Sequence, residues 1–248
     1  YLIYAPSFEY LNKLRDYFIN NDESTPYVDI RSFVSDLSGF FNKEVIHYYR
    51  DFIKRSFSLS STGATAYFNW EKDEISVTNM DLFYYIVKSS STTSYSSYLK
   101  AYSYETEGKE KVTFKLSDYG YKVVKSDTET LIPLVVANVL FCSPNYLNLF
   151  YRGDKLFSYV GEIYYNDPEY QTIFGNVTNS SSVGLRESTI NSLCFVMDYF
   201  YGLKEDKNIT SFRDYIPSDL MDGLKSTVAA DNRNAYKSLL VNRLDDLH

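Results

Sequence analysis

The chain is short of the residues on which much enzyme chemistry depends, with 10 Gly, 2 His and 2 Cys among 248 residues. No glycine-rich phosphate-loop pattern occurs, so the usual backbone cradle for a nucleotide phosphate is missing. His47 is the one internal histidine, and a serine–histidine pair or a metal site would have to rely on it. We therefore predict no catalytic residue, no metal ligand and no cofactor, and we favour a non-enzyme.

Cysteine is equally scarce. Cys142 and Cys194 both lie in apolar runs, which is typical of buried free thiols. The chain has no run of about 20 apolar residues, so we expect no membrane span. These features favour a cytoplasmic protein. Asn-x-Ser/Thr patterns at Asn176, Asn179 and Asn208 keep an extracellular binding domain open as an alternative.

A second alternative is an enzyme that uses carboxylates. The 32 Asp and Glu residues supply many candidate acid–base pairs, and none stands out. On a helix beginning near Asn42, His47 would share a face with Glu44 and Asp51. That stripe has the chemistry of a divalent metal site, although ordinary pairing on a solvated helix face explains it equally well.

Tyrosine is the residue in excess, with 26 Tyr and 17 Phe in the chain. Tyrosine combines a large contact area with a hydroxyl that tolerates water, and protein interfaces are enriched in it. Aromatic pairs in the second half would anchor a protein partner. The predicted protein-binding residues are Tyr164, Tyr165, Tyr199 and Tyr201.

The balance of charge changes at the same point in the chain as the predicted secondary structure. Residues 1–125 carry 15 Lys and Arg against 16 Asp and Glu, whereas residues 126–248 carry 10 against 16. The net charge of −7 argues against a polyanion-binding chain as a whole and leaves room for a basic face in the first half. We predict two domains, a mixed α+β domain over 1–125 and a helical domain over 126–248.

Three helices are predicted at the start of the chain. Phe8, Leu11, Leu14 and Phe18 lie in helical phase, a second helix follows Asp29, and Asn42 would cap a third that carries Val45 to Ile53. Two hairpins follow. The first joins Thr65–Trp70 to Ile75–Thr78, and the second joins Leu99–Glu105 to Lys111–Leu116.

Basic residues cluster on and after the second hairpin. Lys109 lies at its tip, Lys111 and Lys115 alternate with apolar residues along its second strand, and Lys122 follows. These four lysines are the predicted nucleic-acid-binding residues. A solvated lysine face on an ordinary hairpin is the simpler interpretation.

Residues 80–125 resemble the end of a winged-helix unit. A helix, a lysine-bearing hairpin and the step Leu116-Ser117-Asp118-Tyr119-Gly120 occur in the order found in that family. The resemblance implies contact with DNA or with protein. The chain departs from DNA-binding members because a Ser/Thr tract, Ser89–Ser97, stands where a basic recognition helix would precede the wing.

The second half reads as helices. Ser126 and Glu129 have capping-box spacing, Ser143-Pro144 and Asp167-Pro168 are helix starts, and apolar stripes run from Ile190 to Tyr201 and from Tyr236 to Leu247. The predicted fold class is therefore α+β and helix-rich, with two short antiparallel hairpins followed by an all-helical second half. The predicted function is a tyrosine-rich, non-enzymatic interaction module, a subunit or regulator of a larger assembly with protein and nucleic-acid contacts.

Overall fold

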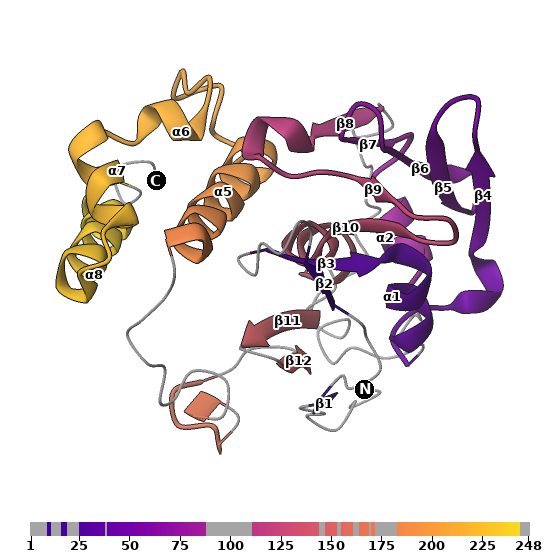
Figure 1. Ribbon diagram of the computed structural model, residues 1–248, viewed down its shortest axis with the longest axis horizontal. Coiled ribbons are helices and arrows are strands. Elements are labelled where there is room, and N and C mark those ends of the chain that lie inside the picture. Colours follow the sequence, from indigo (N-terminus) through magenta and orange to yellow (C-terminus); the bar gives the residue numbers. More distant parts are fainter. Residues whose placement is uncertain are drawn as a thin grey trace, which may run out of the picture. The chain divides into compact units, whose positions relative to one another are not determined.

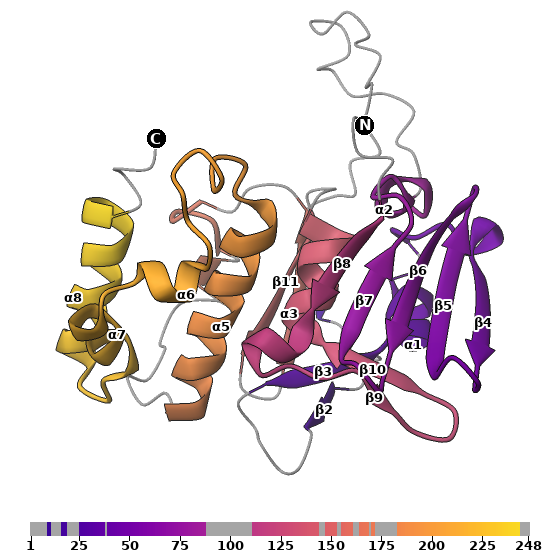
Figure 2. The same cartoon turned by 90° about the horizontal axis from the view of Figure 1, so that it is seen from above.

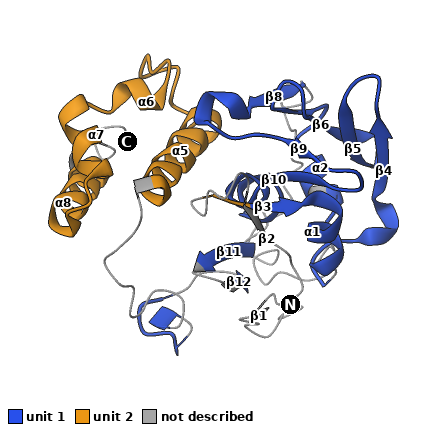
Figure 3. Ribbon diagram, in the orientation of Figure 1, with its two compact units in different colours: residues 1–17, 27–175 blue, residues 18–26, 176–248 orange. Residues whose placement is uncertain are grey.

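The computed structural model describes residues 9–10, 16–18, 25–37, 39–87, 111–143, 147–152, 155–160, 164–168, 170–171 and 183–243. Its contacts divide the chain into two compact units, shown in Figure 3. Unit 1 comprises residues 1–17 and 27–175, and unit 2 comprises residues 18–26 and 176–248. The predicted domains 1–125 and 126–248 stay a prediction, because compactness alone does not test which segments fold independently.

A five-stranded antiparallel sheet dominates unit 1, with strand order β4-β5-β6-β7-β8 (Figures 1 and 2). Alternation of buried and exposed residues explains the strands: in β5, Phe57 and Leu59 face the core while Ser58 and Ser60 face outward. Thr62 and Gly63 both have positive φ in the β5–β6 turn, as a two-residue hairpin turn requires. The strands are β4 His47–Asp51, β5 Ser56–Ser61, β6 Ala64–Asn69, β7 Glu74–Val77 and β8 Val112–Lys115.

Helices and a second sheet supply the rest of the core of unit 1. The Phe141 ring packs against the rings of Phe33, Phe68 and Phe83, at centroid distances of 6.2, 6.3 and 4.9 Å. It therefore joins the sheet to two helices through one fully buried side chain. The helical elements are α1 Ile30–Asp36, η2 Lys43–Val45, α2 Leu82–Tyr85, η4 Leu116–Tyr119, α3 Leu134–Ala137 and the π-helix η5 Asn138–Cys142.

Asp29 ties the second sheet to helix α1. Its buried carboxylate accepts hydrogen bonds from the backbone amides of Ser32 and Thr130, each at 2.9 Å. The first bond caps α1 at the predicted position. Two small sheets complete unit 1, with orders β2-β3-β10-β9 and β1-β12-β11. Their strands are β1 Glu9–Tyr10, β2 Asp16–Phe18, β3 Pro26–Asp29, β9 Val124–Lys125, β10 Thr130–Pro133, β11 Leu147–Arg152 and β12 Lys155–Val160.

Unit 2 is built on the long helix α5. Asp198 of this helix accepts hydrogen bonds from the Phe212 amide and the Lys204 ammonium, both at 2.8 Å. Arg186 donates to the backbone oxygens of Ser226 and Thr227. These bonds fasten the later helices to α5. The helices are α5 Val183–Phe200, α6 Phe212–Tyr215, α7 Ser218–Lys225, α8 Ala229–Ser238 and the π-helix η7 Leu239–Arg243.

The predicted fold class is wrong in two respects. The first half contains a five-stranded sheet rather than two separate hairpins, and the second half contains strands β10, β11 and β12 as well as helices. The segments predicted as the first helix, the third helix and the helix after Ser143 contain strands β1 and β2, β4, and β11. The partner strand is distant in sequence for β1, which pairs with β12, whereas β4 and β11 each pair with the strand that follows.

The two hairpins differ in outcome. The first is confirmed, because β6 and β7 pair with Phe68 opposite Ile75. In the second, the predicted closing strand is β8, which pairs with β7, with Phe114 opposite Ile75. The other predicted strand, Leu99–Glu105, and the tract Ser89–Ser97 lie outside the described residues. The described part of the segment that resembles a winged helix comprises α2, β8, η4 and β9, and its strand β8 belongs to the larger five-stranded sheet.

Candidate functional site

The outer face of the five-stranded sheet is polar and carries two exposed tyrosines. Cross-strand register aligns Tyr49, Ser58, Tyr67, Ser76 and Thr113 in one row from β4 to β8. Ser76 and Thr113 share a hydroxyl hydrogen bond of 2.9 Å within this row. Because Tyr49 is 66% exposed, its phenol presents contact area at the β4 end of the row.

Beyond Tyr49, the β4–β5 turn carries Ile53, which has the highest exposed fraction among the large apolar side chains of the described residues. The β4–β5 turn consists of residues 52–55, and its first two side chains are Phe52, 65% exposed, and Ile53, 95% exposed. An isolated exposed apolar residue needs no explanation. Two adjacent ones on one turn offer a patch of apolar area that a partner could cover.

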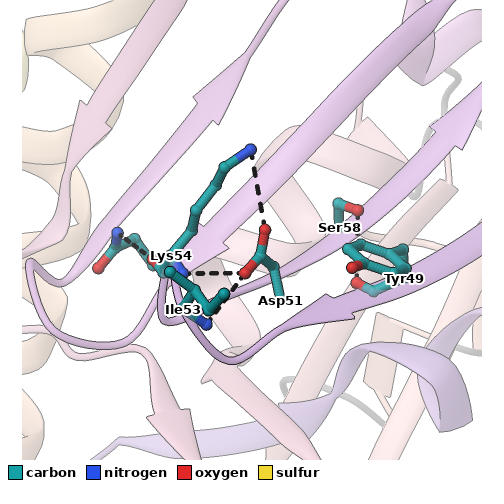
Figure 4. A network of polar contacts seen from close by, with 6 residues as sticks. Tyr49, Asp51, Ile53, Lys54 and Ser58 are labelled. Carbon is teal, nitrogen blue, oxygen red and sulfur yellow. Dashed lines mark hydrogen bonds and ion pairs between the residues drawn. The ribbon is translucent and has the colours of Figure 1, made fainter.

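Asp51 holds this turn in one conformation (Figure 4). Its Oδ1 accepts hydrogen bonds from the backbone amides of Ile53, at 3.0 Å, and Lys54, at 2.9 Å. The Lys54 ammonium lies 3.7 Å from Oδ2 of the same carboxylate. This side-chain arrangement is the one by which aspartate stabilises tight turns, so Phe52 and Ile53 are presented by an ordered backbone.

Contacts from neighbouring segments brace the turn further. The Asn69 amide donates to the Lys54 carbonyl oxygen at 3.4 Å, and Arg55 pairs with Glu71 at 2.6 Å. Arg55 itself has φ of 51°, a left-handed conformation that closes the turn. The Lys125 ammonium lies over the Phe52 ring, 5.2 Å from its centroid. These contacts connect the β4–β5 turn with the β6–β7 turn and with β9.

Positive and negative groups alternate around the patch. The same Lys125 ammonium lies 5.7 Å from the ring centroid of Trp70, the one tryptophan of the chain. Arg50 donates to the backbone oxygen of Asp127 at 2.8 Å and to the Thr130 hydroxyl at 3.1 Å. With Asp51 and Glu71 close by, the rim is mixed in charge rather than uniformly basic.

The predicted lysines fall in three settings. Lys109 lies outside the described residues. Lys115 is exposed on β8, opposite Glu74 of β7 in the cross-strand register. Lys111 is exposed just before β8, and Lys122 is exposed between η4 and β9. The three described lysines thus lie just before β8, on β8 and between η4 and β9.

The predicted tyrosines divide into two pairs. Tyr164 and Tyr165 are 61% and 72% exposed in unit 1, and the Tyr165 ring lies 5.3 Å from that of Tyr170. Tyr199 and Tyr201 belong to unit 2 and are half-buried against Phe195 and Phe212, at 5.3 and 6.4 Å. Tyr164 and Tyr165 are therefore more exposed to solvent than Tyr199 and Tyr201.

The helical stripe proposed for His47 does not form. His47 begins strand β4, Glu44 lies in η2, and Asp51 is engaged by the turn amides. Asn42 does cap η2, through a 3.2 Å hydrogen bond from the Glu44 amide, but the helix ends at Val45. Within the described segments, no three His, Cys, Asp or Glu side chains gather closely enough to hold a metal ion.

The two thiols lie where the sequence predicted, buried and free. Burial raises the pKa of Cys142 well above its ordinary value of 9.0. Burial likewise raises the pKa of Cys194 to about 11, and nearby Arg213 lowers it in part. Since the thiolate is the reactive form, both cysteines are poor nucleophiles at neutral pH.

Comparison of the chain with protein-family models, curated proteins and solved structures gives no match. Among the helices of the described residues, none combines the length and the apolar character needed to cross a membrane.

Sequence reasoning missed the β4–β5 turn because Val45, Ile46, Tyr49, Phe52 and Ile53 also fit one face of a helix. The signal available was Phe52-Ile53 between Asp51 and Lys54-Arg55, followed by the alternation of β5. An apolar pair enclosed by charges and followed by a period of two is typical of a hairpin turn that exposes its tip.

Proposed function

We propose that this chain is a non-enzymatic interaction module, a subunit or regulator of a larger assembly, and that it contacts a protein partner through the β4–β5 turn. The observation that carries the proposal is the exposure of Ile53 and Phe52 on a turn that Asp51 holds rigid.

The composition of the patch supports a protein partner. Interface residues that contribute most to affinity are enriched in tryptophan, tyrosine and arginine. Here Tyr49 lies on β4 before the turn, Arg55 lies in the turn, and Trp70 donates its backbone amide to Arg55. Burying a Phe or Ile side chain contributes about 1.5–3 kcal/mol each. Because the turn is already ordered, little of this gain is lost to fixing its conformation on binding.

The charges around the patch also favour protein over a polyanion. A nucleic-acid surface needs an excess of cations over the contact area. Around this turn Lys54 is matched by Asp51 and Arg55 by Glu71. A rim of alternating sign instead matches the polar periphery of protein interfaces.

Nucleic-acid contact through Lys109, Lys111, Lys115 and Lys122 is a separate part of the proposal. Replacing the three lysines that the structure describes by glutamine should weaken binding to duplex DNA or RNA and flatten its dependence on salt. An unchanged isotherm over a salt series would remove this part and leave the turn unaffected. We also place the module in the cytoplasm, which its two buried free thiols support.

The turn is tested by removing its apolar side chains while keeping its backbone. The double variant F52S/I53S should lose the partners that co-sediment with the wild-type protein in extract of its own cell. L203S is the matched control, because Leu203 is an exposed apolar residue of unit 2. If F52S/I53S retains the same partners at the same level as L203S, the turn is not the contact surface.

A further inference from the structure

Strand β4 occupies the end of the five-stranded sheet and, among the described strands, pairs only with β5. A strand in this position presents backbone amides and carbonyls along its other edge, ready to pair with another strand. Proteins usually shield such an edge with proline, a bulge, a very short strand or charged side chains that point inward. Residues 47–51 read His-Tyr-Tyr-Arg-Asp, without proline or a bulge, and the inward-facing charge of Arg50 is already occupied by hydrogen bonds to Asp127 and Thr130.

The side chains of β4 are self-complementary when two copies run antiparallel about Tyr49. In that register His47 lies opposite Asp51 of the second copy, and Tyr48 lies opposite Arg50. Directly opposed residues have Cβ atoms about 4.5–5.5 Å apart, close enough for such pairs to interact. The pairing therefore sets an imidazole against a carboxylate, a phenol against a guanidinium, and Tyr49 against its own copy.

Facial placement agrees with this register. Tyr48 and Arg50 lie opposite Leu59 and Phe57 of β5, and hence on the inner face, whereas Tyr49 lies opposite Ser58 on the outer face. Directly opposed residues of an antiparallel pair lie on the same face of the sheet. The inner face of one copy therefore continues into the inner face of the other, and the outer face into the outer face. Pairing about Arg50 instead would oppose two guanidiniums, which the register about Tyr49 avoids.

We propose that two copies of this chain associate through β4, antiparallel and centred on Tyr49, to form one continuous ten-stranded sheet. The interface is isologous, since each copy contributes the same five residues. The β4–β5 turns then stand at opposite ends of the shared ladder, and the dimer presents two copies of the proposed contact surface. This inference goes beyond the proposed function and does not depend on it.

Cysteine cross-linking tests the register directly. In a Y49C variant the two new cysteines would face each other across the two-fold axis, with Cα atoms about 4.5–5.5 Å apart, within the range of a disulfide. Y67C is the matched control, because Tyr67 is an exposed tyrosine on the same face of β6. Its counterpart would lie about five strand spacings away, roughly 24 Å. The native thiols are buried and do not compete.

The expected result is a covalent dimer of Y49C under mild oxidation and none of Y67C. Sedimentation equilibrium should show a wild-type dimer, with a dissociation constant raised at least tenfold in Y49K and unchanged in Y67K. H47D, which opposes two carboxylates, should weaken the dimer more than H47K. A monomeric wild type at 100 µM, equal oxidation of the two cysteine variants, or an unaffected Y49K dimer would each overturn the proposal.

The same measurements separate this inference from the proposed function. F52S/I53S should remain dimeric, because its substitutions lie beyond the paired residues, even as it loses its partner. H47D, which leaves Tyr49 and the turn in place, should become monomeric and keep its partner. If the dimer proposal fails its test, the turn can still be the contact surface for a partner. If the turn proposal fails its test, the dimer proposal still stands.

Discussion

Substitution of Asp51 by alanine tests whether the β4–β5 turn is held rigid by one carboxylate. The side chain supplies both acceptor bonds to the amides of Ile53 and Lys54. Removing a capping side chain of this type costs about 0.5–2 kcal/mol, and an exposed ion pair such as that with Lys54 adds little. We therefore expect the free energy of opening the turn to fall by about 1–2 kcal/mol.

Amide hydrogen exchange measures this opening residue by residue. A fall of about 1–2 kcal/mol predicts exchange roughly 5- to 30-fold faster at Ile53 and Lys54 in D51A, with amides in the middle of β5 unchanged. D51N keeps one oxygen acceptor and should show a smaller increase. D127A is the control, since Asp127 is an exposed aspartate on the neighbouring β9–β10 turn.

Partner binding should weaken in D51A, because the turn is less ordered before binding. D51A keeps Phe52 and Ile53, so any loss of affinity reports the cost of ordering the turn on binding. Equal exchange rates at Ile53 and Lys54 in D51A, D127A and wild type would refute the idea that Asp51 preorganises the contact surface.

Three further predictions concern the core and the thiols. F141A removes the ring that packs on Phe33, Phe68 and Phe83 and should lower the free energy of unfolding of unit 1 by about 3–5 kcal/mol in urea titration, with F141L costing less; a loss below 1 kcal/mol would contradict the described core. D29A leaves the Ser32 and Thr130 amides without their acceptor and should cost about 2–4 kcal/mol by the same titration, more than D29N, which keeps one oxygen acceptor; a cost of D29A below about 1 kcal/mol would contradict the role of these two hydrogen bonds. Cys142 and Cys194 should resist iodoacetamide in the folded protein up to pH 9, because their raised pKa values keep them protonated, and should both react once urea unfolds the chain; rapid labelling of either in the folded state would contradict its burial.

Local signals in the sequence predicted several caps and one long helix, although the helix expected after Asn42 ends at Val45. Asp29 caps α1, Asn42 caps η2, and the apolar stripe from Ile190 forms part of α5, which ends at Phe200 just before Gly202. The Glu129 amide donates to the Ser126 hydroxyl at 3.1 Å, as in one half of a capping box, and the Ser126 hydroxyl donates to the Glu129 carboxylate at 3.3 Å. They close the turn between β9 and β10 instead of starting a helix, because the same side-chain geometry serves either element.

Strand pairing is what the sequence left undetermined. Residues 45–53 fit helical spacing and strand spacing alike, and β5, with Phe57 opposite Arg50, selects the strand. Likewise β8 pairs with β7, with Val112 opposite Val77 35 positions earlier. Such partners are set by long-range packing, which local propensity does not report. The candidate site was missed for the same reason, since the turn exists only once β4 and β5 pair.

The most direct test of the central claim compares the sedimentation of three proteins in extract of their own cell. We predict that wild type and L203S sediment together in an assembly larger than the chain or its dimer, and that F52S/I53S sediments at the size of the free protein. Sedimentation of F52S/I53S with the assembly, at the wild-type fraction, would contradict the assignment of the β4–β5 turn as the contact surface.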